Sequence, residues 1–307
     1  MPQPERQTRS YLMRLFERHG FHPRHDLGQN FLIDLNIIEF VVASAELTLD
    51  DVVLEIGTGT GGMTTFMAQE AAHVLSVDID RNMHRLAADV TADFDNITLL
   101  TRDALKNKNH FAPEVLDKIQ ELLGAAPGRR LKLVANLPYA VATPVISNLV
   151  ASDLPWARMV VTIQYELGQR MQADPTVSNY GALSVWLQSQ CRVTMLKKVG
   201  PQVFWPRPKV DSAIMDILPD PDRAVRIGSR AFFHDYGRRV FNQRRKLLRK
   251  VLTGMYDNLS REQIEALIQE AGLTESARAE EIPVDTHIVL ANRLQQILGD
   301  SSIDTDN

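Results

Sequence analysis

The stretch Val52-Val53-Leu54-Glu55-Ile56-Gly57-Thr58-Gly59 decides the fold of this chain. Its first five residues are mostly apolar and β-branched, which predicts a strand that is buried on both faces. Further glycines follow at positions 61 and 62, so the strand leads into a loop whose backbone can approach a ligand closely. Gly57, Gly59 and Gly62 also fit the spacing G-x-G-x-x-G, which predicts a nucleotide-binding unit and would suit NAD equally well.

Strands and helices alternate on both sides of this stretch. Apolar patterns predict strands over residues 52–56, 73–77, 97–101, 131–135 and 159–164, and helices over residues 37–45, 62–70, 82–90 and 143–151. Such alternation is typical of a parallel sheet that helices cover on both faces. The segment 105–130 interrupts the pattern, and its apolar residues predict an added surface helix.

The chain is expected to consist of four parts. An arginine-rich N-terminal segment contains a short amphipathic helix around residues 11–16. The alternating pattern breaks near Pro219-Asp220-Pro221-Asp222, and the sequence beyond it has a helical pattern to about residue 298. We therefore expect a basic extension over residues 1–23, an α/β domain over 24–219, a helical domain over 220–298 and a disordered tail over 299–307.

Composition narrows the class of protein. The chain has 307 residues, 44% of them hydrophobic and 23% charged, which is typical of a globular protein large enough for two domains. No apolar run approaches the length of a membrane span, and the acidic Glu5 and Glu17 argue against a signal or transit peptide. The single cysteine, Cys191, excludes an internal disulfide and a multi-cysteine zinc site, and its apolar neighbours predict an inert core thiol. We expect a cytoplasmic protein with no bound metal.

Positive charge gathers in one segment, although the net charge of the chain is −4. No acidic residue lies between positions 238 and 250, and the basic residues there are Arg238, Arg239, Arg244, Arg245, Lys246, Arg249 and Lys250. In a single helix, three of them would form a basic stripe beside an apolar stripe of Phe241, Leu248 and Leu252. That face could bind RNA phosphates, or it could be an ordinary solvated face.

Two carboxylates and one polar loop follow the predicted strands. Asp78 comes about twenty residues after the glycine loop, where an acidic side chain can accept hydrogen bonds from both ribose hydroxyls of a nucleoside cofactor. Asp103 could accept a hydrogen bond from an adenine amino group. Asn136-Leu137-Pro138-Tyr139 closes the strand 131–135. An ordinary strand-to-loop turn is one interpretation of it, because asparagine and proline are common turn residues.

The same loop is suited to bind a planar exocyclic amine. The carboxamide oxygen of Asn136 and the carbonyl oxygen of Leu137 could each accept one N–H of an adenine 6-amino group, while Tyr139 stacks on the base. A dehydrogenase has no use for such a loop, whereas an amine methyltransferase does. Together with Glu55 at the end of the first strand, the loop therefore favours S-adenosyl-L-methionine over NAD as the cofactor.

Several motifs in this order carry a specific resemblance. They are Leu27-Gly28-Gln29-Asn30-Phe31-Leu32, Glu55-Ile56-Gly57-Thr58-Gly59, Asp103-Ala104, Asn136-Leu137-Pro138-Tyr139, Tyr180-Gly181-Ala182-Leu183-Ser184, Phe204-Trp205-Pro206-Arg207-Pro208-Lys209-Val210-Asp211-Ser212, Phe241-Asn242-Gln243-Arg244-Arg245-Lys246 and Arg278-Ala279-Glu280. From about residue 24 to 297 the chain resembles the KsgA-type small-subunit ribosomal RNA adenine N6-dimethyltransferases. The set as a whole is far more specific than any one motif.

The resemblance implies a fold, an activity and a partner. The fold would be a Rossmann-like class I methyltransferase domain, with helices on both faces of a parallel-rich seven-stranded sheet, plus a small all-helical C-terminal domain. The activity would be S-adenosylmethionine-dependent N6,N6-dimethylation of two adjacent adenosines in a loop near the 3′ end of small-subunit (16S) rRNA, coupled to ribosome biogenesis. The partner would be the small ribosomal subunit, and we expect a monomer that needs neither a membrane nor a metal.

The resemblance also implies roles for individual residues. Around the target base, the implied catalytic residues are Asn136, Leu137, Pro138, Tyr139 and, as the opposite aromatic wall, Phe204. The implied cofactor-binding residues are Gln29, Asn30, Leu32, Glu55, Gly57, Gly59, Asp78, Ile79, Asp103, Ala104 and Asn136. Gln29, Asn30 and Leu32 would close over the methionine end of the cofactor. The seven basic residues of 238–250 would bind RNA.

Departures from the family pattern leave alternatives open. Ala140 stands where asparagine is common, Tyr165 replaces a basic residue, and the 105–130 segment is longer than in compact members. These differences affect the expected target geometry and RNA affinity more than the catalytic groups. The alternatives are a large-subunit rRNA adenine methylase of the macrolide-resistance type and a non-catalytic RNA-binding assembly factor.

Overall fold

The structure is a computed structural model of the chain, and it describes residues 6–303. The chain divides into two compact units. One comprises the chain up to Gly168 together with Thr194–Pro219, and the other comprises Gln169–Val193 and the chain from Asp220 onward. The expected α/β domain of residues 24–219 is therefore interrupted, because residues 169–193 belong with the helical unit. Residues 6–23 of the expected N-terminal extension are included in the α/β unit and do not form a separate part, and residues 1–5 lie outside the described residues.

A seven-stranded sheet forms the centre of the first unit, in the order β4-β3-β2-β7-β8-β11-β9. The strands are β2 (Asp51–Ile56), β3 (His73–Asp78), β4 (Ile97–Thr101), β7 (Arg130–Asn136), β8 (Trp156–Gln164), β9 (Cys191–Val199) and β11 (Ser212–Pro219). The five strands from β4 to β8 are parallel, and β11 is antiparallel to β8. The predicted parallel-rich seven-stranded sheet is confirmed.

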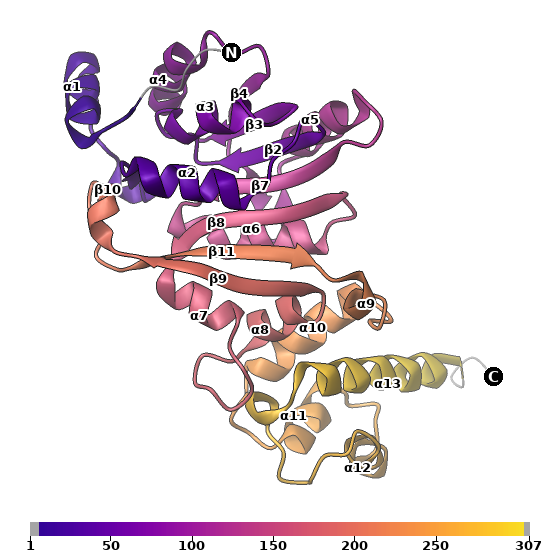
Figure 1. Cartoon of the computed structure of the whole chain (residues 1–307). Coiled ribbons are helices and arrows are strands. Elements are labelled where there is room, and N and C mark those ends of the chain that lie inside the picture. Colours follow the sequence, from indigo (N-terminus) through magenta and orange to yellow (C-terminus); the bar gives the residue numbers. More distant parts are fainter. Residues whose placement is uncertain (1–5, 304–307) are drawn as a thin grey trace. The chain divides into compact units, whose positions relative to one another are not determined.

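Helices cover both faces of this sheet (Figure 1). The helices of the first unit are α1 (Arg9–His19), α2 (Leu35–Ser44), α3 (Gly62–Ala68), α4 (Arg81–Thr91), α5 (Pro113–Gly124) and α6 (Tyr139–Ala151), and α7 (Tyr165–Met171) continues into the second unit. Two short sheets pair β1 (Phe31–Leu32) with β10 (Phe204–Trp205), and β5 (Leu105–Asn107) with β6 (His110–Phe111). The 3-10 turns η1 (His25–Leu27) and η2 (Pro201–Val203) complete the unit.

Two predicted helices differ from the structure. The helix predicted over residues 143–151 begins at Tyr139, because Pro138 supplies the turn and the chain becomes helical directly after it. The helix predicted in the segment 105–130 is α5, but it is not an added surface helix. Its apolar face buries Val115, Ile119 and Leu122 and contacts β2, β3 and β7, so it belongs to the layer that covers the sheet.

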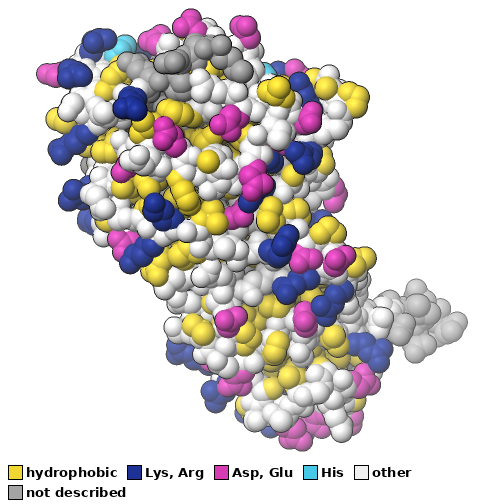
Figure 2. Space-filling model, in the orientation of Figure 1, with side chains coloured by type: hydrophobic (Ala, Val, Ile, Leu, Met, Phe, Trp, Pro, Cys, Tyr) yellow, Lys and Arg dark blue, Asp and Glu magenta, His cyan; other side chains and the backbone are white. Residues whose placement is uncertain are grey.

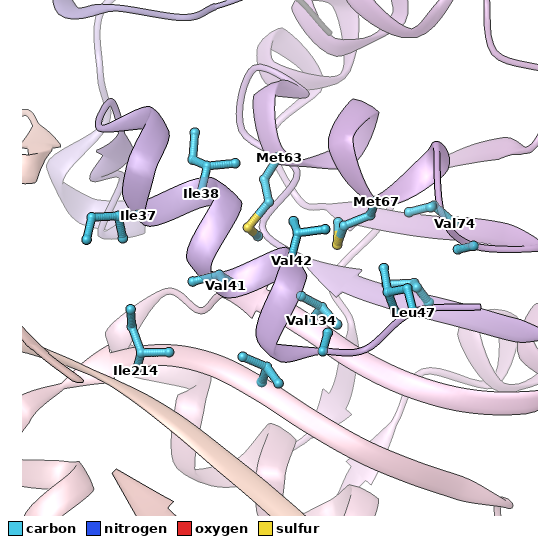
Figure 3. Packing of buried hydrophobic residues seen from close by; sticks show 14 of the residues in the cluster. Ile37, Ile38, Val41, Val42, Leu47, Met63, Met67, Val74, Val134 and Ile214 are labelled. Carbon is cyan, nitrogen blue, oxygen red and sulfur yellow. The ribbon is translucent and has the colours of Figure 1, made fainter. Parts of the chain in front are cut away.

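The main core lies between α2, α3 and one face of the sheet (Figure 3). Ile37, Ile38, Val41 and Val42 of α2 form one cluster with Met63 and Met67 of α3 and with branched residues of the strands, including Val74, Val134 and Ile214. Alternate strand residues point to this face, which is why a nearly continuous apolar strand can bury both of its faces. The core holds α3, and with it the glycine loop, firmly against the sheet.

A buried ion pair lies at the opposite end of the central strands from the glycine loop. The ammonium of Lys132 lies 2.8 Å from the Asp51 carboxylate and donates hydrogen bonds to the carbonyl oxygens of Ala45 and Glu46. Lys132 is 5% exposed and Asp51 is fully buried, so water cannot replace a missing partner. We expect Lys132→Ala to lower the free energy of unfolding by about 3–5 kcal/mol, because Asp51 would keep a buried charge with a weaker partner.

Urea denaturation of the full chain measures that loss. The control is Lys118→Ala, which removes a lysine paired with Glu121 on α5 at 2.7 Å. Because the lysine side chain is 30% exposed and the glutamate side chain 66%, water can replace either partner, and the loss of the pair should cost less than about 1 kcal/mol. Equal stability losses in the two variants would contradict the role given to the buried pair.

Helices make up the second unit. Its α-helices are α8 (Ala182–Gln188), α9 (Pro221–Ala224), α10 (Arg230–Phe241), α11 (Leu248–Met255), α12 (Arg261–Glu270) and α13 (Val284–Ile303), with the 3-10 turn η3 (Ala279–Glu281). Helix α10 packs against α8, α11 and α13, and the hydroxyl of its buried Tyr236 lies 3.0 Å from Nδ1 of His287. The predicted helical C-terminal region is confirmed. The tail expected over 299–307 begins inside α13, and its residues 304–307 lie outside the described residues.

The basic segment is not one helix. Helix α10 ends at Phe241 and α11 begins at Leu248, so the stripe predicted through both is wrong. Residues 242–246 form turns, and Leu247 has extended backbone and pairs with Arg278 in an isolated bridge. This contact from a distant segment breaks a helical pattern that the local sequence supports.

Two smaller expectations can also be compared with the structure. Cys191 is buried, and burial raises the pKa of its thiol to about 12, as expected for an inert core residue. Over residues 6–303, no helix is both long enough and apolar enough to cross a bilayer.

Candidate active site

The glycine loop after β2 is packed too closely for side chains at two positions. Gly57 has φ +89°, and a Cβ there would lie 3.1 Å from Cδ of Pro138. Gly59 has φ +55°, and a Cβ there would lie 3.0 Å from the ring of Phe31. Other residues adopt such backbone angles only with strain, and here the neighbouring ring would also have to move by a few tenths of an ångström. The two glycines therefore bring the loop backbone to the edge of a cavity.

The cavity lies at the carboxyl ends of β2, β3, β4 and β7, where open α/β sheets bind their ligands. Its volume is about 200 Å³. Its predicted lining residues are Gln29, Asn30, Gly57, Gly59, Asp78, Ile79, Asp103, Ala104, Asn136, Leu137, Pro138 and Tyr139. Its other lining residues are Asp26, Leu27, Gly28, Phe31, Ile56, Val77, Arg102, Leu105, Ala140 and Val141. The structure thus brings most of the predicted site residues together.

Asp78 joins the glycine loop to the next strand. One of its carboxylate oxygens accepts a hydrogen bond from the N–H of Gly59 at 3.0 Å, and the other accepts from the N–H of Asp80 at 2.9 Å. Burial raises the pKa of Asp78 above its ordinary value. Beside it, the apolar side chain of Ile79 is 52% exposed and lines the cavity. A carboxylate and an open apolar surface therefore lie next to each other at the edge of the cavity.

Asn136 is held in one orientation. Its Nδ2 donates a hydrogen bond to the backbone carbonyl of Asn30 at 2.8 Å. The carboxamide oxygen cannot take that place, because two acceptors would face each other. The N–H of Leu137 donates to the carbonyl of Thr162 at 3.1 Å, which fixes the following peptide as well. The oxygen of Asn136 is therefore left on the side of the amide that does not face Asn30.

Tyr139 is fixed by a residue of another strand. Its hydroxyl lies 2.7 Å from Oγ of Ser212, the first residue of β11. Burial raises the pKa of Tyr139, so this hydroxyl stays protonated and can donate to the serine. The bond anchors one end of the ring while the ring lines the cavity. The sequence showed Ser212 as part of a motif but gave no sign of this contact.

Gln29 has a different environment from the one expected. Its Nε2 donates to Asp80 at 2.8 Å and its Oε1 accepts from the N–H of Arg24 at 2.8 Å. Both ends of the amide are thus bound by the protein. In this structure Gln29 lines the cavity as part of the wall that ties the segment before β1 to the start of α4.

Three predicted site residues do not line the cavity. Phe204 is only 3% exposed and belongs to the core cluster, and Leu32, its partner in the β1–β10 pair, packs against the same cluster. Glu55 is buried beneath the glycine loop. The predicted aromatic wall at Phe204 is therefore not formed in this structure, because the short β1–β10 sheet draws that side chain into the core.

Glu55 belongs to a buried hydroxyl network. Its Oε2 accepts hydrogen bonds from Ser76 and, at 2.6 Å, from Thr64, and Thr58 lies 2.6 Å from the hydroxyl of Ser76. Burial raises the pKa of Glu55 from its ordinary 4.5 to about 8. The carboxyl group therefore supports the glycine loop from beneath and does not face the cavity.

The raised pKa predicts a pH-dependent stability. The folded protein keeps a proton that the unfolded chain releases, so this group's contribution is complete below pH 4.5 and declines as the pH rises toward about 8. Glu55→Gln is neutral at every pH, and at pH 7 we expect it to be more stable than the wild type by up to about 3 kcal/mol. Urea unfolding at several pH values measures the difference, which should vanish near pH 4.5.

The control for this prediction is Glu39→Gln on the exposed face of α2, which should change stability little at any pH. A constant difference between Glu55→Gln and the wild type across the pH range would show that Glu55 does not titrate as its burial implies.

Two of the seven predicted RNA-binding residues are held by hydrogen bonds to backbone carbonyls. Arg239 donates to the carbonyl of Met255 at 2.7 Å. Arg244 donates to the carbonyl of Tyr180 at 2.8 Å and lies 3.3 Å from the Glu280 carboxylate. The guanidinium groups of both are occupied within the helical unit. They are poor candidates for binding phosphate.

The other five basic residues are more accessible. Arg245, Lys246 and Lys250 are exposed, Arg249 is half-buried, and Arg238 is exposed but paired with Asp235 at 2.8 Å. Elsewhere, Figure 2 shows acidic and basic side chains interspersed over one face of the molecule. Within residues 6–303, no group of three or more His, Cys, Asp or Glu side chains is arranged to hold a metal ion.

The sheet order, the glycine loop and the cavity define a class of protein, the Rossmann-like class I methyltransferases. Two solved structures share this fold. A dimethyladenosine transferase from Plasmodium falciparum has a TM-score of 0.71 at 22% identity, covering 86% of this chain and 96% of that chain. The 23S rRNA methyltransferase ErmE has a TM-score of 0.62 at 22% identity, covering 87% of this chain and 100% of that chain. At such identities the similarity establishes the fold alone.

Similarity of sequence identifies the family more specifically than similarity of fold does. A model of the family described as ribosomal RNA adenine dimethylase matches residues 20–296. Proteins named ribosomal RNA small subunit methyltransferase A are similar as well. The one from Alkaliphilus metalliredigens is 34% identical over 91% of this chain and 94% of its own length, and the one from Streptococcus pneumoniae (strain JJA) is 35% identical over 92% and 95%. The chain belongs to the ribosomal RNA adenine dimethylase family.

Proposed function

We propose that this protein transfers methyl groups from S-adenosylmethionine to N6 of two adjacent adenosines in a loop near the 3′ end of small-subunit rRNA. Family membership and the named relatives support the reaction and the RNA. The single observation that carries the proposal is the anchored amide of Asn136 at the edge of the cavity. The proposed partner is the small ribosomal subunit, and the proposed acting form is a cytoplasmic monomer.

The cavity fits the proposed cofactor. Gly57 and Gly59 leave the loop without side chains, so its backbone can lie against a ligand. The carboxylate of Asp78 can accept from ribose hydroxyls, Ile79 offers an apolar surface to a flat base, and Asp103 can accept from its amino group. When bound, S-adenosylmethionine supplies an electrophilic methyl group on a sulfonium.

The Asn136–Tyr139 loop fits an adenine amine. The carboxamide oxygen of Asn136 and the carbonyl of Leu137 are the proposed acceptors for the two N–H groups, and the ring of Tyr139 is the proposed stacking surface. Two acceptors favour a pyramidal nitrogen, whose lone pair is then no longer delocalised into the base. These interactions strengthen as the nitrogen becomes pyramidal, so they lower the barrier more than they stabilise the bound substrate.

The reaction needs no protein nucleophile and no strong base. The amine proton can leave to water after transfer, and Tyr139 stays protonated because burial raises its pKa. The second methylation has one N–H fewer, so it proceeds without one hydrogen bond worth about 1 kcal/mol. The target must be unstacked to enter the cavity, which favours an adenosine in a loop over a paired one.

Transfer of labelled methyl groups tests the proposal. The purified chain is incubated with tritiated S-adenosylmethionine and small-subunit particles that lack this modification, and the labelled base is mapped. Label should appear as N6,N6-dimethyladenosine at two adjacent positions near the 3′ end of the small-subunit rRNA. Label only in large-subunit particles would favour the alternative methylase, and no label in either would favour a non-catalytic assembly factor.

The proposed RNA-binding surface gives a separate prediction. Arg245 and Lys246 are exposed, so reversing both charges should weaken RNA binding and lower its dependence on salt, by about 0.7 in the log–log slope for each phosphate of a single-stranded loop that is no longer neutralised. RNA affinity measured at several salt concentrations gives this slope. Reversal of the exposed Arg192 and Lys197 on β9 is the matched control. An unchanged slope in the Arg245 and Lys246 variant would mean that these side chains are only solvated.

A further inference from the structure

The N-terminal segment Gln7–Phe16 contacts the glycine loop at Thr60. We propose that this segment, here called the strap, holds the loop in its cofactor-binding conformation, and that Gln7 is a positioning residue for the cofactor. The inference deepens the proposed function and rests on its cofactor site. The sequence suggested only a basic extension and an amphipathic helix in this region.

Gln7 binds the loop through both ends of its amide. Its Nε2 donates to the carbonyl of Thr60 at 3.0 Å, and its Oε1 accepts from the hydroxyl of the same residue. Gln7 is 7% exposed and Thr60 is 4% exposed, so water does not compete for these bonds. A Cβ at Gly62 would lie 2.9 Å from Oε1 of Gln7, so the glycine there lets the amide approach the start of α3.

Most of helix α1 lies within the strap, and its buried face packs the strap against the rest of the α/β unit. Thr8 caps the helix through the N–H of Tyr11, and the buried Leu12 and Phe16 pack in a cluster with Phe31, Met83 and Leu86. This anchor also reaches the loop, through Phe31. The rings of Phe16 and Phe31 lie 5.4 Å apart, and Phe31 in turn lies against Gly59.

The two contacts act on Gly59, itself a proposed cofactor-binding residue, and on Thr60, its neighbour. Gly59 donates its N–H to Asp78, the proposed ribose-binding group, and Thr60 is the next residue along the loop. A shift of Thr60 would therefore move the N–H that orients the Asp78 carboxylate. Glycine-rich backbone has many accessible conformations. The contact with Gln7 restricts the loop before the cofactor binds, so less conformational entropy of the loop is lost on binding.

Cofactor binding by variants of the full chain tests the strap. Gln7→Met conserves the volume and removes both hydrogen bonds, and Thr60→Val removes only the hydroxyl. Met13→Ala, at an exposed position on α1, is the control. Titration calorimetry measures the Kd for S-adenosylmethionine, and parallel assays give the RNA Kd and kcat at saturating cofactor. We expect Gln7→Met to raise the cofactor Kd by about tenfold and Thr60→Val to raise it by less.

The RNA Kd, and kcat at saturating cofactor, should stay within about twofold of the wild type, because Gly59 keeps its hydrogen bond to Asp78 in these variants and the bound cofactor holds the loop. Unchanged cofactor Kd values in both Gln7→Met and Thr60→Val would overturn the inference and leave the strap as a packing element. An equal loss of RNA affinity would also overturn it. If Gln7→Met does not fold, Thr60→Val alone decides. A wild-type chain that does not bind S-adenosylmethionine would remove the proposed function itself.

Discussion

We expect Asn136→Ala to lower the rate of methyl transfer by roughly a hundred- to a thousandfold, the range seen when one preorganised hydrogen-bonding group is removed from an active site. The oxygen of Asn136 is oriented before substrate arrives, because Nδ2 is already bound to the carbonyl of Asn30. Its interaction with the target amine strengthens as the nitrogen becomes pyramidal. The expected effect is therefore on kcat, with the Kd for S-adenosylmethionine changed by only about twofold.

Single-turnover methyl transfer to small-subunit particles, together with cofactor titration, measures the two effects separately. Asn148→Ala is the control, because it removes an asparagine from α6 whose amide bonds the carbonyl of Lys108 outside the cavity. Asn136→Asp adds a second test. It keeps an acceptor oxygen but faces the carbonyl of Asn30 with another acceptor, so it should also lose most activity. Near-normal turnover in Asn136→Ala would reject the amine-binding role.

The fold was largely predictable because its signals are local. The strand 52–56, the glycines after it and the repeated alternation of elements each depend on a few neighbouring residues. The seven-stranded, parallel-rich sheet and the helical C-terminal region were expected from the family resemblance, and both are confirmed. The prediction failed where a distant segment decides. Leu247 pairs with Arg278 and breaks a helix that residues 238–252 would otherwise favour.

The site was predictable where residues follow a strand directly. Asp78 and Asn136 end strands, and parallel strands bring their carboxyl ends to one edge, so their meeting follows from the topology. The environments of Gln7, Phe204 and Ser212 depend on pairings between segments that are far apart in the sequence. Glu55 is adjacent to the loop, yet its role depends on its burial. The apolar strand pattern indicates that position 55 is buried, whereas a charged residue type suggests that it is exposed.

Asp78→Ala should weaken S-adenosylmethionine binding by about a hundredfold, because charge-assisted hydrogen bonds each contribute about 1.5–3 kcal/mol. The same change removes the acceptor for the N–H groups of Gly59 and Asp80, so the loop loses its link to β3. Asp78→Asn keeps one acceptor oxygen and nearly the same shape. Its loss of affinity should lie between those of the wild type and Asp78→Ala, and titration calorimetry measures all three.

Asp89→Ala, at an exposed position on α4, is the matched control and should bind the cofactor as the wild type does. Comparing the loss of cofactor affinity with the loss of kcat separates two contributions of Asp78. If the carboxylate acts mainly on the ribose, saturating cofactor restores the turnover of Asp78→Ala, because only the ground-state affinity has changed. If it acts mainly by holding Gly59, kcat falls as well, since the loop and Pro138 are in close contact at Gly57. Unchanged affinity in Asp78→Ala would mean that the nucleoside lies elsewhere, and the assignment of the cavity to the cofactor would then be wrong.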